Sequence, residues 1–289
     1  MKMVVVGANG QLGNALSRTV THGIEICPMD LPKLDITDAG NVDATIARES
    51  PDLIVNAAAY TAVDRAEKER DLAFAVNAEG PANLARAAET HGCRLIHVST
   101  DYVFDGTAGS PYPDNAPCKP LGVYGRSKRQ GEVNVLETAG QPLIIRTSWL
   151  YSPWGANFVL TMLKLMRSKD KLTVVADQIG SPTFAVTLAG AIRAAMDRPQ
   201  LHGIYHWADA GVASWYDFAV AIQEEALAMG LLERSIPIRP IPTSAYPTRA
   251  KRPAYSVLDS SRTWSDFAME PVHWRTALRT CLADMVRGS

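Results

Sequence analysis

A chain of 289 residues with 47% hydrophobic and 20% charged residues has the composition of an ordinary globular protein, long enough for one large domain or two smaller ones. Its formal net charge of −1 gives no electrostatic reason to expect nucleic acid or an anionic membrane surface as a partner. The first residues show no secretory signal and no apolar run is long enough to span a bilayer, so we expect a cytoplasmic protein without a membrane partner.

The first half of the chain alternates short β-like runs with longer helical segments. Four runs are apolar and rich in β-branched residues, as expected for strands of a parallel sheet covered on both faces: residues 2–7, 52–57, 94–99 and 142–147. Residues 72–92 carry apolar side chains at helical spacing and end at a glycine. We therefore predict an α/β fold in which residues 1–150 form a Rossmann-type, doubly wound parallel sheet that binds a dinucleotide.

The pattern loosens in the second half. Residues 153–168 and 214–230 are predicted helices, the second with Ser214 as its N-cap. The proline-rich segment 236–253 cannot be a regular central strand or helix. We predict that residues 151–289 form a smaller C-terminal substrate-binding lobe over the carboxyl edge of the sheet, with some segments crossing back to the first domain.

Three glycines, Gly7, Gly10 and Gly13, follow the first strand directly and precede a helical pattern. Such glycines allow a tight turn, so that a pyrophosphate can lie on the amide groups at the start of the helix. Asp30 ends the second β-like run, where a carboxylate would meet the adenosine ribose. The combination predicts a dinucleotide site. The alternative is an ordinary glycine turn and a strand-terminal aspartate, both of which are common.

The charge of Asp30 bears on the choice of cofactor. A carboxylate accepts hydrogen bonds from a 2′-hydroxyl and repels a 2′-phosphate, which favours NADH. Lys33 is close in sequence and could offset the repulsion, so NADPH stays open as the cofactor.

The segment 121–132 contains a tyrosine and a lysine four residues apart, Tyr124 and Lys128. On a helix this spacing places both side chains on the same face, one turn apart. Taken alone, the pair is better explained as part of a half-exposed helix surface.

After a dinucleotide site, this Y-x-x-x-K pattern resembles the motif of the short-chain dehydrogenase/reductase superfamily. Ser99 and Thr100 end the fourth predicted strand, where members of that superfamily carry a catalytic hydroxyl. The segment 76–84 also resembles a helix of the extended branch, which carries the pattern N-x-x-G-x-x-x-L through Asn77, Gly80 and Leu84.

Further segments along the whole chain point to one family within this superfamily. They occur in the order and spacing of the dTDP-4-dehydrorhamnose reductase family, which the chain resembles. Reductases of related deoxysugars share much of this pattern. The segments are GANGQLG, DLIVNAAAYTAVDRAE, STDYVFDG, VYGRSK, IRTSWLY, NFVLTML, DQIGSPT and PTSAYPT followed by RP.

This resemblance implies reduction of the C4 ketone of a dTDP-linked 6-deoxy-L-hexulose to dTDP-L-rhamnose, an L-rhamnose donor for cell-surface polysaccharide. Tyr124 would donate the proton, because negative charge gathers on the carbonyl oxygen as hydride arrives. The ammonium of Lys128 would lower the pKa of the phenol from its ordinary value near 10 and would also hold the nicotinamide ribose. Thr100, rather than Ser99, would hydrogen-bond the reacting oxygen.

The family pattern also carries over to residues that would bind the cofactor. Asp35 has the alternative interpretation of a helix-capping aspartate. The implied positions are Gly10, Gln11 and Leu12 at the phosphates, Asp30, Asp35 and Ile36 at the adenosine, and Ala59, Tyr60 and Thr61 after the third strand.

For the dTDP-4-keto-6-deoxy sugar, the resemblance implies contacts from Thr100, Asp101, Tyr102, Trp149 and Arg252. The aromatic rings could pack on the sugar or the thymine, or they could be core aromatics. The arginine lies in the family's R-P pattern and could meet the diphosphate. The basic residues just before it are equally well explained as a solvated loop.

No metal site is expected. The histidines and carboxylates lack metal-ligand spacing, and four distant cysteines without a Cys-x-x-Cys pair argue against zinc and a disulfide framework. Some members of the family are understood to dimerise through Mg²⁺ held by carboxylates, but the corresponding positions here are Ala15 and Val186. We therefore expect a monomer, with no magnesium-dependent dimer.

Two other functions stay open. The first is that of another nucleotide-sugar ketoreductase or epimerase-reductase of the same superfamily. The second is that of a regulatory or scaffold protein that binds a dinucleotide without turnover, although such a protein has no need of Thr100, Tyr124 and Lys128 together.

Overall fold

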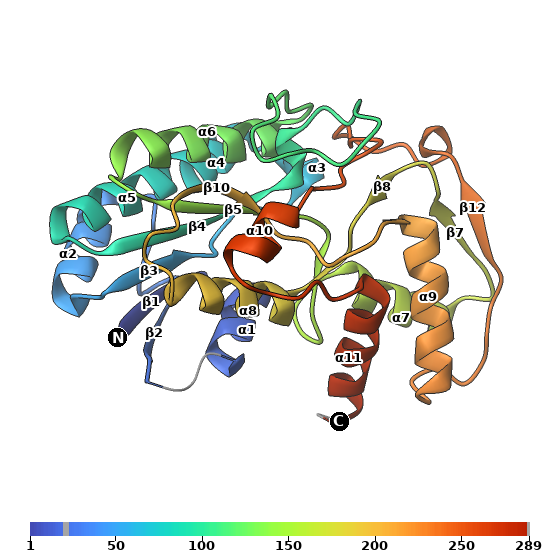
Figure 1. Ribbon diagram of the computed structural model, residues 1–289. Coiled ribbons are helices and arrows are strands. Elements are labelled where there is room, and N and C mark those ends of the chain that lie inside the picture. Colours follow the sequence, from blue (N-terminus) through green and yellow to red (C-terminus); the bar gives the residue numbers. More distant parts are fainter. Residues whose placement is uncertain (20–22, 288–289) are drawn as a thin grey trace.

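The computed structural model describes residues 1–19 and 23–287 (Figure 1). Among these residues, six parallel strands form the main sheet in the order β10-β5-β4-β3-β1-β2. This order confirms the predicted Rossmann-type, doubly wound α/β fold. The strands are β1 (Lys2–Val6), β2 (Glu25–Met29), β3 (Leu53–Asn56), β4 (Arg94–Thr100), β5 (Leu143–Thr147) and β10 (Gly203–His206).

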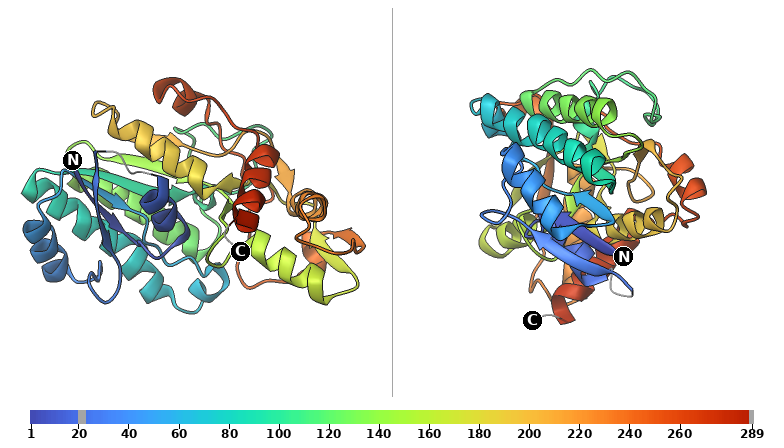
Figure 2. Two further views of the ribbon diagram at one scale, coloured as in Figure 1. Left: turned by 90° about the horizontal axis from the view of Figure 1, so that it is seen from below. Right: turned by 90° about the vertical axis from the view of Figure 1, so that its left-hand side faces the viewer.

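Helices cover both faces of this sheet, as the right-hand view of Figure 2 shows. Successive side chains of a strand point to opposite faces, so Met3 and Val5 pack with one helical layer while Val4 and Val6 pack with the other. This two-sided burial explains why the middle positions of the strands are mostly apolar. The first layer contains α1 (Gln11–Thr19) and α8 (Ala185–Met196), and the second contains α2 (Ala39–Glu49), α5 (Gly80–His91) and α6 (Val123–Thr138).

The connection from β3 to β4 is helical, as predicted for residues 72–92, but it is not a single α-helix. A π-helical turn, η1 (Ala75–Glu79), lies between α4 (Arg70–Phe74) and α5, after the short helix α3 (Val63–Ala66). Turns of this kind are rare and occur frequently at functional sites. Asn77 lies in this turn.

The second lobe is built around an aromatic and aliphatic core that includes Tyr151, Phe184, Phe218 and Trp274. Ser214 caps α9 through a capping box with Asp217, which confirms the predicted N-cap. The core lies among α7 (Phe158–Ser168), α9 (Trp215–Ala228) and α11 (Trp274–Arg287), which form the other end of the molecule in Figure 2.

The second lobe also contains short strands that pair two by two. The proline-rich segment supplies β12 (Ile238–Ile241), whose one partner strand in the described part of the chain is β7 (Leu172–Val175), in agreement with the expectation that it is no central strand. The remaining elements are β6 (Leu150–Tyr151), β8 (Ile179–Gly180), β9 (Thr183–Phe184), β11 (Ala213–Ser214), α10 (Ser261–Asp266) and the 3₁₀ turns η2 (Asp101–Val103) and η3 (Thr243–Ala245).

Two elements from beyond residue 150 belong to the first layer and sheet: α8 packs on α1, and β10 pairs with β5. The division of the chain at residue 150 stays a prediction.

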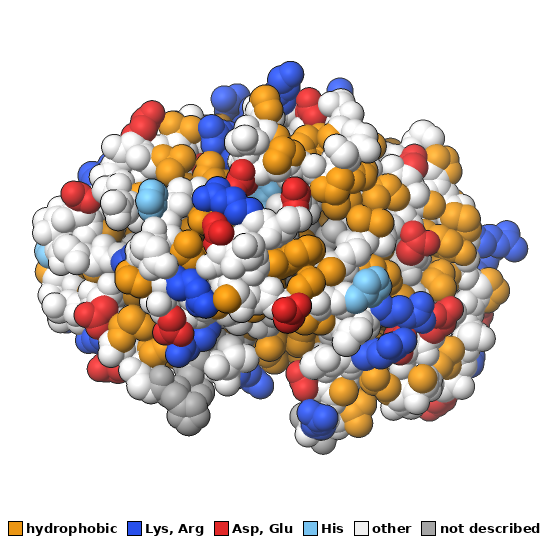
Figure 3. Space-filling view, in the orientation of Figure 1, with side chains coloured by type: hydrophobic (Ala, Val, Ile, Leu, Met, Phe, Trp, Pro, Cys, Tyr) orange, Lys and Arg blue, Asp and Glu red, His pale blue; other side chains and the backbone are white. Residues whose placement is uncertain are grey.

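On the face drawn in Figure 3, acidic and basic side chains are interspersed over both lobes. No helix in the described part of the chain is long and apolar enough to cross a membrane.

Candidate active site

A cleft of about 570 Å³ lies at the carboxyl ends of the central strands, between the sheet and the start of the second lobe. Parallel α/β sheets bind their ligands at this edge, because loops from neighbouring strands converge there. The cleft brings together most of the residues predicted from the sequence: Gly10, Gln11, Leu12, Ala59, Thr61, Thr100, Asp101, Tyr124, Lys128 and Trp149.

The glycine loop fits the predicted phosphate site. Gly7 has φ +79°, and a Cβ atom there would lie 2.6 Å from the Ala58 nitrogen. A Cβ atom on Gly13 would lie 2.4 Å from the Gly7 oxygen. Only glycine allows these approaches. Helix α1 begins at Gln11, between the two glycines, so its first free N–H groups lie at the cleft.

Asp30 anchors the glycine loop as well as bordering the predicted adenosine site. Its carboxylate accepts hydrogen bonds from the backbone nitrogens of Asn9 and Leu31, both at 2.9 Å. An adjoining cavity of about 260 Å³ is lined by Asp30, Asp35 and Ile36, together with Ala59. These residues, predicted separately from the sequence, therefore share one site.

The helix-cap interpretation of Asp35 is wrong. Asp38 caps α2 instead, accepting from the Asn41 nitrogen at 3.0 Å. The carboxylate of Asp35 accepts from the backbone nitrogen and the hydroxyl of Thr37, which fixes the loop just before that cap.

Asn77 fixes the backbone of the loop that follows β3. Its side-chain oxygen accepts from the Tyr60 nitrogen at 2.8 Å, and its nitrogen donates to the Tyr60 oxygen at 3.0 Å. The same nitrogen lies 3.0 Å from the Ser127 hydroxyl on α6. Tyr60 itself lines neither cavity, because its hydroxyl donates to Glu69. Asn77 thus joins the loop to the helix that carries Tyr124.

Tyr124 and Lys128 lie one turn apart on α6 and both face the cleft, as their spacing predicts. Lys128 is buried, and its ammonium donates to the Val98 oxygen at 2.7 Å. Burial lowers the pKa of Lys128 to about 8.

The pKa of Tyr124 differs from the expectation. Burial raises the pKa of Tyr124 to about 12, although a hydrogen bond with Thr100 acts to lower it. We expected the ammonium of Lys128 to lower this pKa. That expectation is wrong for this arrangement, because the ammonium is directed to the Val98 carbonyl group and desolvation of the phenol dominates.

Thr100 and Asp101 form the wall of the cleft at the end of β4. The Thr100 hydroxyl donates to the Asp101 carboxyl group at 3.0 Å and accepts from the Tyr102 nitrogen at 3.2 Å. Burial raises the pKa of Asp101 to about 7, although hydrogen bonds from Ser256 and Thr100 act to lower it. Its Oδ2 atom is buried and has no hydrogen-bond partner among the described residues. A polar group of a ligand would fit this oxygen.

Trp149 lines the cleft and also packs on the core of the second lobe. Its indole stacks on that of Trp215, with ring centroids 3.5 Å apart and planes 4° from parallel. Its φ of +46° is unusual for a bulky residue. Gly180 allows the stack, since a Cβ atom there would lie 2.5 Å from the Trp149 ring. The stack confirms the interpretation of Trp149 as a core aromatic, and its contact with the dTDP-sugar stays a prediction.

Arg252 does not line the main cleft. It forms an ion pair with Asp64 at 2.6 Å and borders a neighbouring cavity with Tyr246 and Arg249. Tyr102 connects the two regions, because it hydrogen-bonds Arg252 and its ring lies edge-on to that of Tyr124, with centroids 5.6 Å apart.

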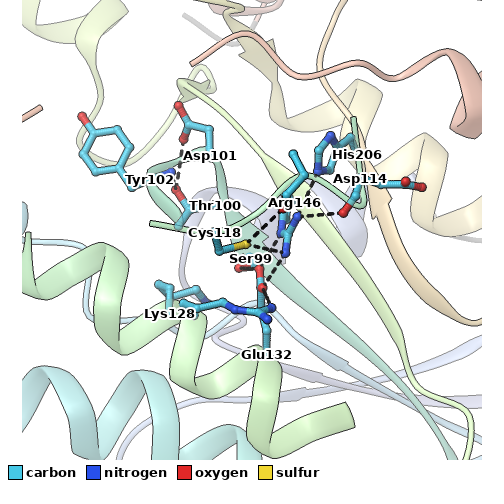
Figure 4. A network of polar contacts seen from close by, with 12 residues as sticks. Ser99, Thr100, Asp101, Tyr102, Asp114, Cys118, Lys128, Glu132, Arg146 and His206 are labelled. Carbon is cyan, nitrogen blue, oxygen red and sulfur yellow. Dashed lines mark hydrogen bonds and ion pairs between the residues drawn. The ribbon is translucent and has the colours of Figure 1, made fainter. Parts of the chain in front are cut away.

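A buried ion pair behind the cleft was not predicted from the sequence (Figure 4). Arg146 of β5 donates to Glu132 of α6 through two nitrogens, each at 2.8 Å, and Ser99 donates to the same carboxylate at 2.6 Å. Burial acts to raise the pKa of Glu132, but Arg146 outweighs it and holds the pKa below its usual range. This contact occupies Ser99, whereas Thr100 is the hydroxyl at the end of β4 that hydrogen-bonds Tyr124.

Sequence signals for this pair exist. Arg146 interrupts the apolar strand Leu143–Thr147, and a charge in a strand buried on both faces needs a partner. Glu132 follows Tyr124 and Lys128 at helical spacing and so lies on the same face of α6.

The two positions at which magnesium ligands would stand are apolar in their surroundings as well. Ala15 is fully buried against the sheet, and Val186 packs between the two cores. In residues 1–19 and 23–287, no group of three or more histidine, cysteine or acidic side chains could hold a metal ion.

Fold and site together are typical of an extended short-chain dehydrogenase/reductase, with a glycine loop after β1 and a tyrosine and lysine four apart on the helix after β4. A sequence model described as the RmlD substrate binding domain matches residues 1–287.

Named relatives narrow this class. The dTDP-4-dehydrorhamnose reductase of Aggregatibacter actinomycetemcomitans is 41% identical over 98% of each chain. A spore coat polysaccharide biosynthesis protein of Bacillus subtilis is 42% identical over 98% of this chain and 97% of its own. The crystal structure of the Bacillus anthracis dTDP-4-dehydrorhamnose reductase in complex with NADP has a TM-score of 0.93 and 36% identity, covering 98% of this chain and 99% of that one. The chain belongs to the dTDP-4-dehydrorhamnose reductase family, which confirms the resemblance stated from its motifs.

Proposed function

We propose that this protein reduces the C4 ketone of dTDP-4-dehydro-L-rhamnose to give dTDP-L-rhamnose, with NADPH or NADH as the reductant. The observation that carries the proposal is the meeting of Thr100, Tyr124 and Lys128 in one cleft with the glycine loop. Family membership supports the same reaction.

The glycine loop, the start of α1 and the cavity beside Asp30 would hold the dinucleotide. A nicotinamide dinucleotide bound there supplies the hydride. Lys128, buried and facing the cleft, would hold the nicotinamide ribose.

Tyr124 donates a proton to the C4 oxygen as negative charge develops on it. A phenol with a raised pKa is neutral at physiological pH, so it carries the proton that the reaction needs. Thr100 hydrogen-bonds Tyr124, and it would hydrogen-bond the same oxygen of the bound sugar. Asp101, Tyr102 and Trp149 would contact the dTDP-sugar, and Arg252 its diphosphate.

Two alternatives stand beside this proposal. The protein could reduce another dTDP-4-keto-deoxysugar, or bind a dinucleotide without turnover. The deciding experiment is a panel of enzymatically made dTDP-4-keto sugars, scored by the loss of NADH and NADPH absorbance. We expect dTDP-4-dehydro-L-rhamnose to be the best substrate. Faster turnover of a different sugar would reassign the substrate, and no turnover of any would leave a binding protein.

The cofactor preference is predicted to depend on Asp30. Replacing Asp30 with alanine should weaken NADH binding more than NADPH binding, because only NADH presents a free ribose 2′-hydroxyl to the carboxylate. Isothermal titration calorimetry with both cofactors measures this difference. Asp30→Asn is the matched control, since its oxygen can still accept from the Asn9 nitrogen and keep the glycine loop in place. Equal losses for the two cofactors in Asp30→Ala would make Asp30 a purely structural residue.

We also propose that the protein is a cytoplasmic monomer and does not form a magnesium-dependent dimer. Mg²⁺ takes oxygen ligands, which the side chains of Ala15 and Val186 cannot provide. Light scattering should give the mass of a single chain with and without EDTA, and the activity should survive chelation. A mass that halves in EDTA would show that the ligands lie elsewhere.

A further inference from the structure

The loop between β6 and α7 is bound to the glycine loop through Gln11. The side-chain oxygen of Gln11 accepts from the Ser152 hydroxyl at 2.9 Å and from the Asn157 amide at 3.0 Å. The Trp154 indole donates to the Gln11 backbone oxygen at 3.1 Å. Gln11 is the first residue of α1 and lines the cleft. The second lobe therefore holds the turn at which the dinucleotide phosphates would lie.

The side chain of Asn157 makes two separate sets of hydrogen bonds, one through its oxygen and one through its nitrogen. Its side-chain oxygen caps α7 by accepting from the Leu160 nitrogen at 3.1 Å. Its side-chain nitrogen donates to Gln11, to the Ser152 backbone oxygen at 2.9 Å and to the Trp154 backbone oxygen at 3.2 Å. The cap needs only an oxygen, so the choice of an amide is explained by the second set of contacts.

The next residue extends the connection to a second residue that lines the cleft. Phe158 begins α7, and its ring packs on Trp215 with centroids 4.6 Å apart. Trp215 in turn stacks on Trp149, which lines the cleft. A continuous set of contacts thus runs from Gln11 through Asn157 and this aromatic stack to Trp149.

We propose that Asn157 is a positioning residue that couples the dinucleotide loop to Trp149, so that cofactor and dTDP-sugar strengthen each other's binding. This inference rests on the proposed function, because it places the cofactor at Gln11 and the sugar nucleotide at Trp149. A ligand that orders one end of the shared contacts leaves less conformational freedom for the second ligand to remove. Such coupling is reciprocal: each ligand changes the affinity of the other by the same factor.

The competing explanation is that Asn157 is only a helix cap. Asn157→Ser separates the two, since serine keeps a capping oxygen but has no amide to donate to Gln11 or to the loop carbonyls. Asp38→Ser is the matched control, because it makes the same kind of cap exchange on α2. Both variants should stay folded, and Asn157→Ser should lower the melting temperature more, because it also loses the hydrogen bonds donated by the amide.

The test is calorimetric titration of NADPH with and without saturating dTDP-L-rhamnose. Both ligands are in their reduced form, so they cannot react with each other. In the wild type and in Asp38→Ser, we expect the sugar nucleotide to tighten NADPH binding by about 5-fold or more. In Asn157→Ser this factor should fall close to one.

Undiminished coupling in Asn157→Ser, or its absence from a wild type that binds both ligands, would overturn the inference while leaving the proposed function intact. A wild type that binds NADPH but not dTDP-L-rhamnose would contradict the proposed function, and the inference with it.

Discussion

Tyr124→Phe should lower turnover by roughly 10²- to 10⁴-fold, the usual contribution of a positioned general acid. The variant loses only the hydroxyl, so the ring can keep its edge-on contact with Tyr102 and the fold should be unchanged. Steady-state kinetics with dTDP-4-dehydro-L-rhamnose measure the effect, and calorimetry should give an unchanged affinity for NADPH.

Tyr216→Phe is a suitable control, because Tyr216 lies on α9, packs against the core of the second lobe and lines no part of the cleft. Its turnover should equal that of the wild type. Wild-type turnover in Tyr124→Phe would contradict the assignment of the proton donor.

Glu132→Gln should destabilise the protein by about 3–5 kcal/mol, because it leaves Arg146 as an uncompensated buried charge. Both side chains are almost inaccessible to water. The pair joins α6 to β5, so the loss should also reduce turnover by loosening the helix that carries Tyr124 and Lys128. Urea denaturation at neutral pH measures the change in free energy of unfolding.

The destabilisation should depend on pH in a defined direction. The pKa of Glu132 is lowered in the folded state, so its stabilising effect is present above the ordinary glutamate pKa and is lost as pH falls through the lowered value. The difference in the free energy of unfolding between the wild type and Glu132→Gln should therefore become smaller in acid. Glu137→Gln, on the exposed side of the same helix, should change stability by no more than about 0.5 kcal/mol. A Glu132→Gln variant as stable as Glu137→Gln would show that the buried pair contributes nothing.

The sheet and the catalytic helix could be predicted because their sequence patterns are local. A strand buried on both faces is largely apolar, as residues 53–55 are, and the four-residue spacing of Tyr124 and Lys128 has one geometric consequence on a helix. The glycines at positions 7 and 13 indicate close backbone contacts that other residues could not make.

Other features depend on contacts between distant residues, which a sequence pattern does not display. Strand β10 belongs to the main sheet although it comes from the second half of the chain, and the sequence of Gly203–His206 does not indicate that it pairs with β5. The side chain of Gln11 was expected at the phosphates, yet it is bonded to residues about 140 positions further on. The pKa of Tyr124 depends on how closely the folded chain surrounds the phenol, so the neighbouring lysine alone gave the wrong direction.

The central claim is that hydride passes from a reduced nicotinamide to C4 of the sugar. The most direct test is a reaction of dTDP-4-dehydro-L-rhamnose with NADPH that carries deuterium at both C4 positions of its nicotinamide. Mass spectrometry and NMR of the product should show dTDP-L-rhamnose with one deuterium atom, bound to sugar C4. A product without deuterium, or with deuterium at another carbon, would contradict the account.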